Sequence, residues 1–216
     1  MARVAKDLAY NGFVAVTIDY RLSGEAAFPA QIQDCKEAVR WLKQNADSYG
    51  IDASRIGATG HSAGGHLSAL LATSAGCEKI EGESENIFIS SRIKAAVAMG
   101  AQSDFLSERN KEVSSDPEKG QIWRQFLGGS QTENTELYRR ASPLYHLDSA
   151  DPPIAFLTGE LDDPSTRAEK FREDAEKLGV PSRLMILEDA PHNFFPNDEW
   201  LDMATYWSIL FFRDNL

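Results

Sequence analysis

The 216-residue sequence predicts an α/β fold in which a mainly parallel sheet of about five strands carries helices on both faces. Short apolar runs rich in β-branched residues alternate along the chain with segments whose apolar residues recur at helical spacing. This alternation favours right-handed crossovers between parallel strands. The chain is 42% hydrophobic, and no repeat or linker divides it, so we expect one domain over residues 1–216.

The expected elements follow from these patterns in chain order. The strands are the apolar runs at residues 13–19, 55–59, 92–101, 154–158 and 183–187. The helices are the segments with helical spacing at residues 31–45, 63–74 and 165–178, followed by a last helix that Asp198 caps. Ligands of such sheets bind beyond the carboxyl ends of the strands, and we expect the functional residues there.

A polar, less regular region separates the third and fourth expected strands. It covers residues 102–151 and contains short helical patterns at residues 121–126 and 133–139. We interpret this region as an insertion of short helices over the sheet.

The segment Gly60-His61-Ser62-Ala63-Gly64 fits the pattern G-x-S-x-G between an expected strand and an expected helix. In this arrangement the serine occupies a sharp turn, and small neighbours let the backbone pass close to itself. The first N–H of the helix, at Ala63, lies beside Ser62 and can stabilise an oxyanion. We therefore expect Ser62 to be a nucleophile, against the alternative of a chance Gly/Ser turn.

A serine hydroxyl needs a base to take its proton, and the sequence has four histidines. His192 follows the last expected strand by a few residues, which puts it at the same edge of the sheet as Ser62. His61 and His66 flank the serine in positions that do not suit proton abstraction, and His146 lies in the insertion. His192 is the expected base, against the alternative of an ordinary surface histidine.

The base in turn needs a carboxylate to orient it. Three carboxylates follow the strand at residues 154–158, and we expect Asp162 in this role, with Asp163 second and Glu160 third. Asp104 is a weaker rival whose alternative role is to cap a helix or turn. The chain order Ser, Asp, His differs from the order in other lineages of serine hydrolases.

The bulk properties exclude several classes of partner. A net charge of −11 repels phosphate backbones and anionic head groups, so we expect no nucleic acid and no membrane as partners. Cys35 and Cys77 lie far apart and indicate neither a metal site nor a disulfide framework. No apolar run approaches the roughly 18 residues that span a bilayer, and no signal peptide is recognisable, so we expect a soluble chain.

Residues along most of the chain carry a resemblance to a known family. Besides His192 they include residues 19–22 (DYRL), 60–67 (GHSAGGHL), 126–129 (FLGG), 141–144 (ASPL) and 159–162 (GELD). The chain resembles the α/β-hydrolase esterases related to hormone-sensitive lipase, most closely the feruloyl or acetyl-xylan esterase-like branch. The resemblance implies the α/β-hydrolase fold, and it places the family's acid on Asp162.

The sequence departs from this family at its start. The family normally carries two or three more strands before the segment equivalent to residues 1–11, with a His-Gly-Gly loop that completes the oxyanion hole. No such loop occurs here, so we expect a chain shortened at its N-terminus and a weakened enzyme. A secretion signal would lie in the same missing part, which leaves localisation open.

One of the missing strands lies, in the family, between those equivalent to residues 13–19 and 55–59. Either these two strands close up or an unpaired edge is exposed. An exposed edge makes a homodimer a candidate assembly.

The expected function is hydrolysis of a carboxylic ester through an acyl-enzyme, with Ser62, Asp162 and His192 as catalytic residues and no metal or organic cofactor. Short-chain and carbohydrate-linked acyl esters are the expected substrates, and nothing in the chain separates acetyl from feruloyl esters. The alternatives are a peptidase-like α/β-hydrolase and a catalytically impaired binding or structural module.

Overall fold

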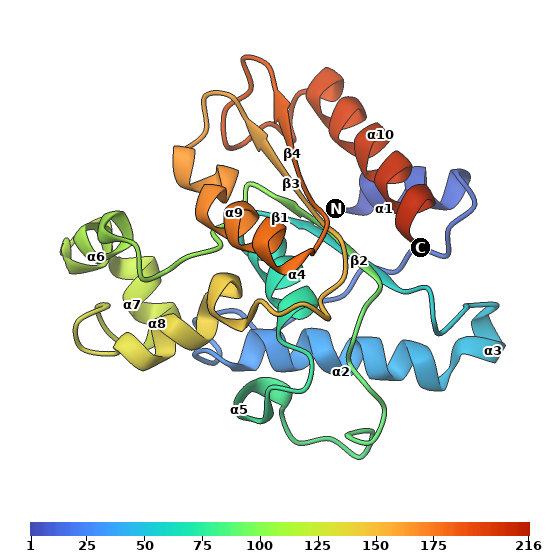
Figure 1. Cartoon of the computed structure of the whole chain (residues 1–216), viewed down its shortest axis with the longest axis horizontal. Helices are drawn as coiled ribbons and strands as arrows, with labels where there is room; N and C mark the ends of the chain where they lie inside the picture. Colours follow the sequence, from blue (N-terminus) through green and yellow to red (C-terminus); the bar gives the residue numbers. More distant parts are fainter.

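The computed structural model describes all 216 residues and contains one sheet of four parallel strands in the order β1-β2-β3-β4 (Figure 1). The strands are β1 (Gly57–His61), β2 (Ala95–Met99), β3 (Ile154–Gly159) and β4 (Ser182–Leu187). All three neighbouring pairs run parallel. The predicted α/β class is confirmed, with four strands where about five were expected.

Helices cover both faces of this sheet (Figure 1). The elements on the first face are α2 (Ala30–Gln44), α4 (Ala63–Thr73) and α9 (Glu169–Leu178), with α3 (Ala46–Tyr49) and α5 (Glu78–Glu81) at its margin. The second face carries α1 (Ala2–Tyr10) and α10 (Asp198–Asn215). Helix α1, which no sequence pattern predicted, buries Val4 and Leu8 beside α10.

The two central strands are buried on both sides. Along β2, Ala96 faces an apolar cluster of 25 residues on the first face, and Val97 faces one of 15 residues on the second. Phe156 and Leu157 divide in the same way along β3. This burial explains why both strands read as continuous apolar runs without alternation.

No strand forms at residues 13–19, which corrects the prediction made from their apolar, β-branched composition. The segment has no regular secondary structure, and residues 14–20 make no backbone-to-backbone hydrogen bond. A groove of about 640 Å³ lies between this segment and β1, with Leu67 and Leu71 of α4 among its lining residues. A strand needs a hydrogen-bonded neighbour, and the groove separates the segment from the only strand nearby. The two segments therefore do not close up, and the outer edge of β1 stays unpaired.

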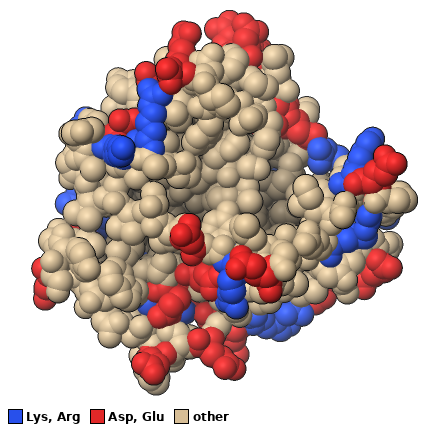
Figure 2. Space-filling view, turned by 180° about the vertical axis from the view of Figure 1, so that it is seen from behind, with Lys and Arg blue, Asp and Glu red and all other residues tan.

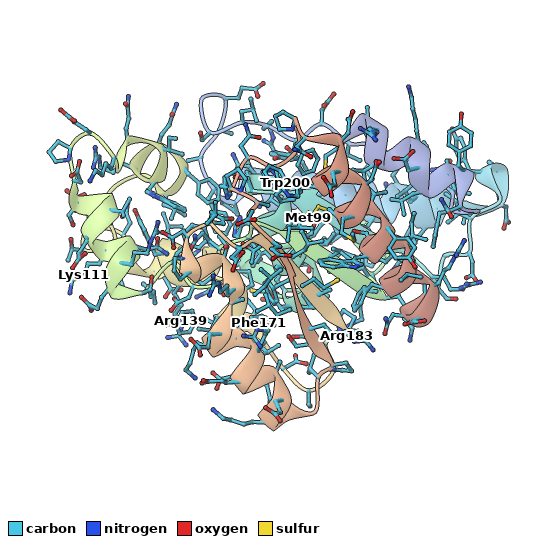
Figure 3. The ribbon with its side chains drawn as sticks, turned by 90° about the horizontal axis from the view of Figure 1, so that it is seen from above. Met99, Lys111, Arg139, Phe171, Arg183 and Trp200 are labelled. Carbon is cyan, nitrogen blue, oxygen red and sulfur yellow. The ribbon has the colours of Figure 1, made fainter.

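The chain between β2 and β3 forms short helices. They are α6 (Glu108–Ser115), α7 (Gln121–Leu127), α8 (Thr135–Ala141) and the 3₁₀ turn η1 (Pro143–His146). Figure 3 shows Met99 near the middle of the molecule and Lys111 of α6 at its periphery. Arg109 of α6 pairs with Asp163, which ties this region to the loop after β3.

Charged side chains lie mainly around the margin of the face seen in Figure 2, where uncharged side chains surround a central hollow. None of the helices combines the length and the apolar character needed to cross a bilayer. Both cysteines are free thiols, and burial raises the pKa of Cys35 to about 12.

The last helix, α10, begins at Asp198, and its N-cap is the preceding residue, Asn197. The sequence predicted Asp198 as the cap. The side-chain oxygen of Asn197 accepts hydrogen bonds from the N–H groups of Glu199 and Trp200. Asp198 is the first helical residue and pairs with Arg3 of α1. Both residues favour a helix N-terminus, but only the side chain that precedes the first turn reaches its free N–H groups.

Removing this cap tests the assignment. We expect Asn197→Ala to lower the free energy of unfolding by about 1 kcal/mol, because two N–H groups lose their acceptor. Asn197→Ser keeps an acceptor oxygen and is the matched control. Urea denaturation of the three proteins measures the difference, and equal stability of Asn197→Ala and the parent chain would contradict the assignment.

Candidate active site

Ser62 lies in a sharp turn between β1 and α4. Its backbone has φ 54° and ψ −114°, a positive-φ conformation that L-residues rarely adopt. The Ser62 N–H donates to the carbonyl oxygen of Met99 at 2.8 Å, and the Ser62 carbonyl accepts from His66 N at 2.9 Å. The strain of this turn is therefore held in place by the neighbouring strand β2 and by α4.

Glycines allow the close packing around this turn. A Cβ on Gly60 would lie 2.4 Å from the carbonyl carbon of Gly64, and one on Gly65 would lie 2.3 Å from the Met99 oxygen. A Cβ on Gly64 would meet no atom within 4 Å. Gly65, which lies just outside the G-x-S-x-G pattern, is thus more tightly constrained than the second glycine of the pattern itself.

The structure brings Ser62, His192 and Asp162 into one hydrogen-bonded chain. His192 Nε2 lies 3.0 Å from Ser62 Oγ, and His192 Nδ1 lies 2.8 Å from Asp162 Oδ2. Ser62 follows β1, Asp162 follows β3 and His192 follows β4, so each residue comes from the carboxyl end of a strand. The Asp162 side chain is only 4% exposed, whereas that of His192 is 44% exposed.

The surroundings of Asp162 favour a charged carboxylate that orients His192. Its oxygens accept hydrogen bonds from the Asp163 N–H at 2.6 Å and from Thr158 Oγ1 at 3.2 Å. Burial disfavours ionisation, but the bond with His192 and these two donors outweigh it and lower the pKa of Asp162. The same bond to Asp162, partly opposed by burial, raises the pKa of His192 above its ordinary value.

The rival carboxylates are bound elsewhere. Asp163 accepts from the N–H and hydroxyl of Ser165 and pairs with Arg109. Glu160 accepts from the Asp189 N–H at 3.0 Å. Asp104 accepts from the Leu106 N–H at 2.8 Å, which is the turn-capping role given as its alternative.

The side chains of two other histidines bond to backbone carbonyl groups within residues 102–151. His66 is buried and hydrogen-bonded to the Ala141 carbonyl at 2.6 Å, while His146 contacts the Arg140 carbonyl at 2.7 Å. His61 differs from both, because its Nε2 lies 2.8 Å from the carbonyl oxygen of His192 itself. No sequence pattern predicts this contact, and only the position of His61 next to Ser62 hints at it.

Some aromatic side chains near the Ser62 turn pack in the core, and others are only partly buried. Phe105 and Phe194 are buried in the two apolar clusters, so they pack the interior and do not line an open pocket. Trp123 is partly buried against Phe105, with ring centroids 4.8 Å apart. Phe195 is partly buried and packs 4.6 Å from the His61 ring.

Backbone donors for an oxyanion begin at Ala63. It is the first residue of α4, so its N–H lies beyond the helix's own hydrogen-bond ladder and next to Ser62. The positive end of the helix dipole lies at the same place. The sequence-predicted donor is thus positioned at the N-terminus of a helix of 11 residues.

Comparison with known proteins places these residues in a wider group. The BD-FAE family model matches residues 1–174. Esterase LipC of Mycobacterium tuberculosis is 30% identical over 199 residues, which are 88% of this chain and 47% of LipC. The chain therefore spans about half the length of this curated relative.

Solved structures share the fold over almost the entire chain. A truncated carbohydrate esterase from gut microbiota has a TM-score of 0.78 and 25% identity, and the match covers 95% of this chain and 76% of that one. The propionate-bound esterase Est2 of Thermogutta terrifontis has a TM-score of 0.76 and 25% identity, with 97% and 75% covered. Both are named as esterases, and both are longer than this chain.

The space around Gly64 and Gly65 predicts different effects of an alanine substitution on stability. We expect Gly65→Ala to destabilise the fold by about 1–3 kcal/mol, because its Cβ on α4 would collide with the Met99 oxygen of β2. Gly64→Ala is the matched control, since it places the same methyl group in open space. Thermal unfolding measures both variants, and equal destabilisation of the two would contradict the packing described here.

Proposed function

Because this chain belongs to the BD-FAE family, we propose that it hydrolyses carboxylic esters through a serine-bound acyl-enzyme. The observation that carries the proposal is the continuous chain of hydrogen bonds from Ser62 through His192 to Asp162, at 3.0 and 2.8 Å. A hydroxyl, an imidazole and a buried carboxylate in this order form the arrangement that activates a serine for acyl transfer.

In the first half-reaction Ser62 Oγ attacks the ester carbonyl while its proton passes to His192 Nε2. Asp162 keeps the other ring nitrogen, Nδ1, protonated and stabilises the imidazolium that forms. His192 then gives its proton to the departing alcohol, so the carbon–oxygen bond breaks without release of an alkoxide.

In the second half-reaction a water molecule attacks the acyl-enzyme. His192 Nε2 takes a proton from this water and returns it to Ser62 Oγ as the carboxylic acid leaves. In both half-reactions His192 transfers the protons and Ser62 carries the acyl group.

The Ala63 N–H stabilises the negative charge that develops on the carbonyl oxygen. Each donor of this kind typically contributes about 10²–10³ in turnover. With Ala63 as its one assigned donor, the chain is proposed to acylate readily with activated esters and to turn over slowly with ordinary ones.

We propose short-chain or carbohydrate-linked acyl esters as substrates. Two neighbours support this class, since one is named as a carbohydrate esterase and the other was solved with propionate. Helix α6, tied to the Asp162 loop by the pair Arg109–Asp163, is proposed to form part of the substrate site.

A catalytically impaired binding module is the second candidate. A peptidase-like activity would use the same three residues on an amide. Comparison of p-nitrophenyl esters with the corresponding p-nitroanilides separates ester hydrolysis from amide hydrolysis, and covalent labelling separates an activated serine from a binding module.

Substitution of the nucleophile tests the proposal. We expect Ser62→Ala to lose p-nitrophenyl acetate hydrolysis by at least about 10⁴-fold and to lose labelling by a fluorophosphonate. Ser68→Ala in the same helix is the control, because its hydroxyl is bonded to the Gly64 carbonyl. Labelling that persists in Ser62→Ala, or its absence from the parent chain, would reject an activated Ser62.

The raised pKa of His192 predicts the pH dependence. The base acts in its neutral form, so kcat/KM falls as pH decreases through a midpoint above the ordinary 6.5. Asp162→Asn removes the interaction that raises this pKa, so we expect the midpoint to move to lower pH and kcat to fall by about 10⁴.

Glu160→Gln is the control, since that carboxylate accepts a hydrogen bond from the Asp189 N–H and keeps an acceptor oxygen as the amide. Rate profiles of the three proteins against pH measure the midpoints. An unmoved midpoint in Asp162→Asn would assign the profile to another group.

A further inference from the structure

His61 occupies the position between Gly60 and Ser62, as the last residue of β1. Its ring packs against the ring of His192, with centroids 5.0 Å apart and planes at 38°. Phe194 and Phe195 hold it from the other directions, at centroid distances of 5.1 and 4.6 Å. The side chain is therefore fixed between the strand that carries the nucleophile and the loop that carries the base.

The hydrogen bond of His61 defines its protonation. Nε2 lies 2.8 Å from the carbonyl oxygen of His192, and because a carbonyl only accepts, Nε2 must carry the hydrogen. Burial lowers the pKa of His61, which outweighs the opposing effect of this bond. His61 is thus a neutral donor at neutral pH, with its hydrogen directed at the backbone of the base and not at Ser62.

The loop around His192 has few other backbone restraints. Within residues 191–193, the His192 carbonyl makes the only backbone hydrogen bond, and His61 supplies its donor. The neighbouring anchors lie just outside, where the Ala190 carbonyl accepts from Leu161 N at 3.0 Å and the Phe194 carbonyl accepts from Asn197 N at 3.1 Å. The His192 side chain is held by Asp162, but its main chain is held by His61.

We propose that His61 is a positioning residue, which fixes the main chain of His192 so that Nε2 of the base stays within reach of Ser62 Oγ. This inference rests on the proposed function. A misplacement of about 1 Å in such an arrangement costs on the order of 10² in rate, so the loss of one well-placed hydrogen bond is measurable. Because the hydrogen bond of His61 acts on the main chain of the base, we expect its loss to affect turnover more than substrate binding.

Two substitutions separate the hydrogen bond from the ring. His61→Phe keeps an aromatic ring among Phe194, Phe195 and His192 but removes the donor. His61→Gln removes the ring but carries an amide N–H at a position similar to that of Nε2. The control is His146→Phe, which removes a bond of the same type, to the Arg140 carbonyl at 2.7 Å, within the helical insertion.

For p-nitrophenyl acetate, we expect His61→Phe to lower kcat by about 10²-fold while KM changes by less than about threefold. His61→Gln should recover most of this loss, and His146→Phe should leave kcat unchanged. Unfolding curves of all variants show whether each protein is folded at the assay temperature.

A second readout needs no turnover. The Nδ1 proton of His192, bonded to Asp162, gives a low-field proton resonance, which we expect to broaden or disappear in His61→Phe and to persist in His61→Gln and His146→Phe. If the parent chain hydrolyses no ester, the proposed function is wrong, and this resonance still decides the positioning role. Unchanged kcat together with an unchanged resonance in folded His61→Phe would overturn the proposal, as would equal losses in His61→Phe and His61→Gln.

Discussion

The Met99–Gly100 segment is the point on which the geometry of the site depends. On one side the Met99 carbonyl accepts the Ser62 N–H at 2.8 Å and leaves room only for a glycine at position 65. On the other side Gly100, with φ +56°, lies so close to His192 that a Cβ would be 3.0 Å from the ring. One turn at the end of β2 therefore fixes the approach of the nucleophile and of the base together.

This arrangement explains how the sequence could predict candidate residues that the structure brings together. Ser62 and His192 each follow a buried strand, and parallel strands deliver their carboxyl ends to one edge of the sheet. The choice of Asp162 is harder to make from the sequence alone, because three carboxylates follow β3 within four residues. Only their partners distinguish them, since Asp163 faces Arg109 and Glu160 faces the Asp189 N–H.

Other features depend on contacts that no local pattern contains. The residues at 13–19 have the composition of a strand, but whether they form one depends on a neighbour that the groove keeps away. The hydrogen bond of His61 is not predictable from its neighbours in the sequence, because its partner lies 131 residues further along the chain. The helix cap at Asn197 was misplaced by a single residue, since two adjacent side chains both suit a helix N-terminus.

The groove beside β1 also makes one stretch of the chain easy to open. Residues 14–20 make no backbone hydrogen bond, and the helix before them is held to α10 by Val4, Leu8 and the ion pairs of Arg3. Detaching this stretch breaks no pairing between strands, so its local unfolding requires far less free energy than the loss of any strand of the sheet. A protease would therefore be able to cleave this stretch while the four strands that position Ser62, Asp162 and His192 remain paired.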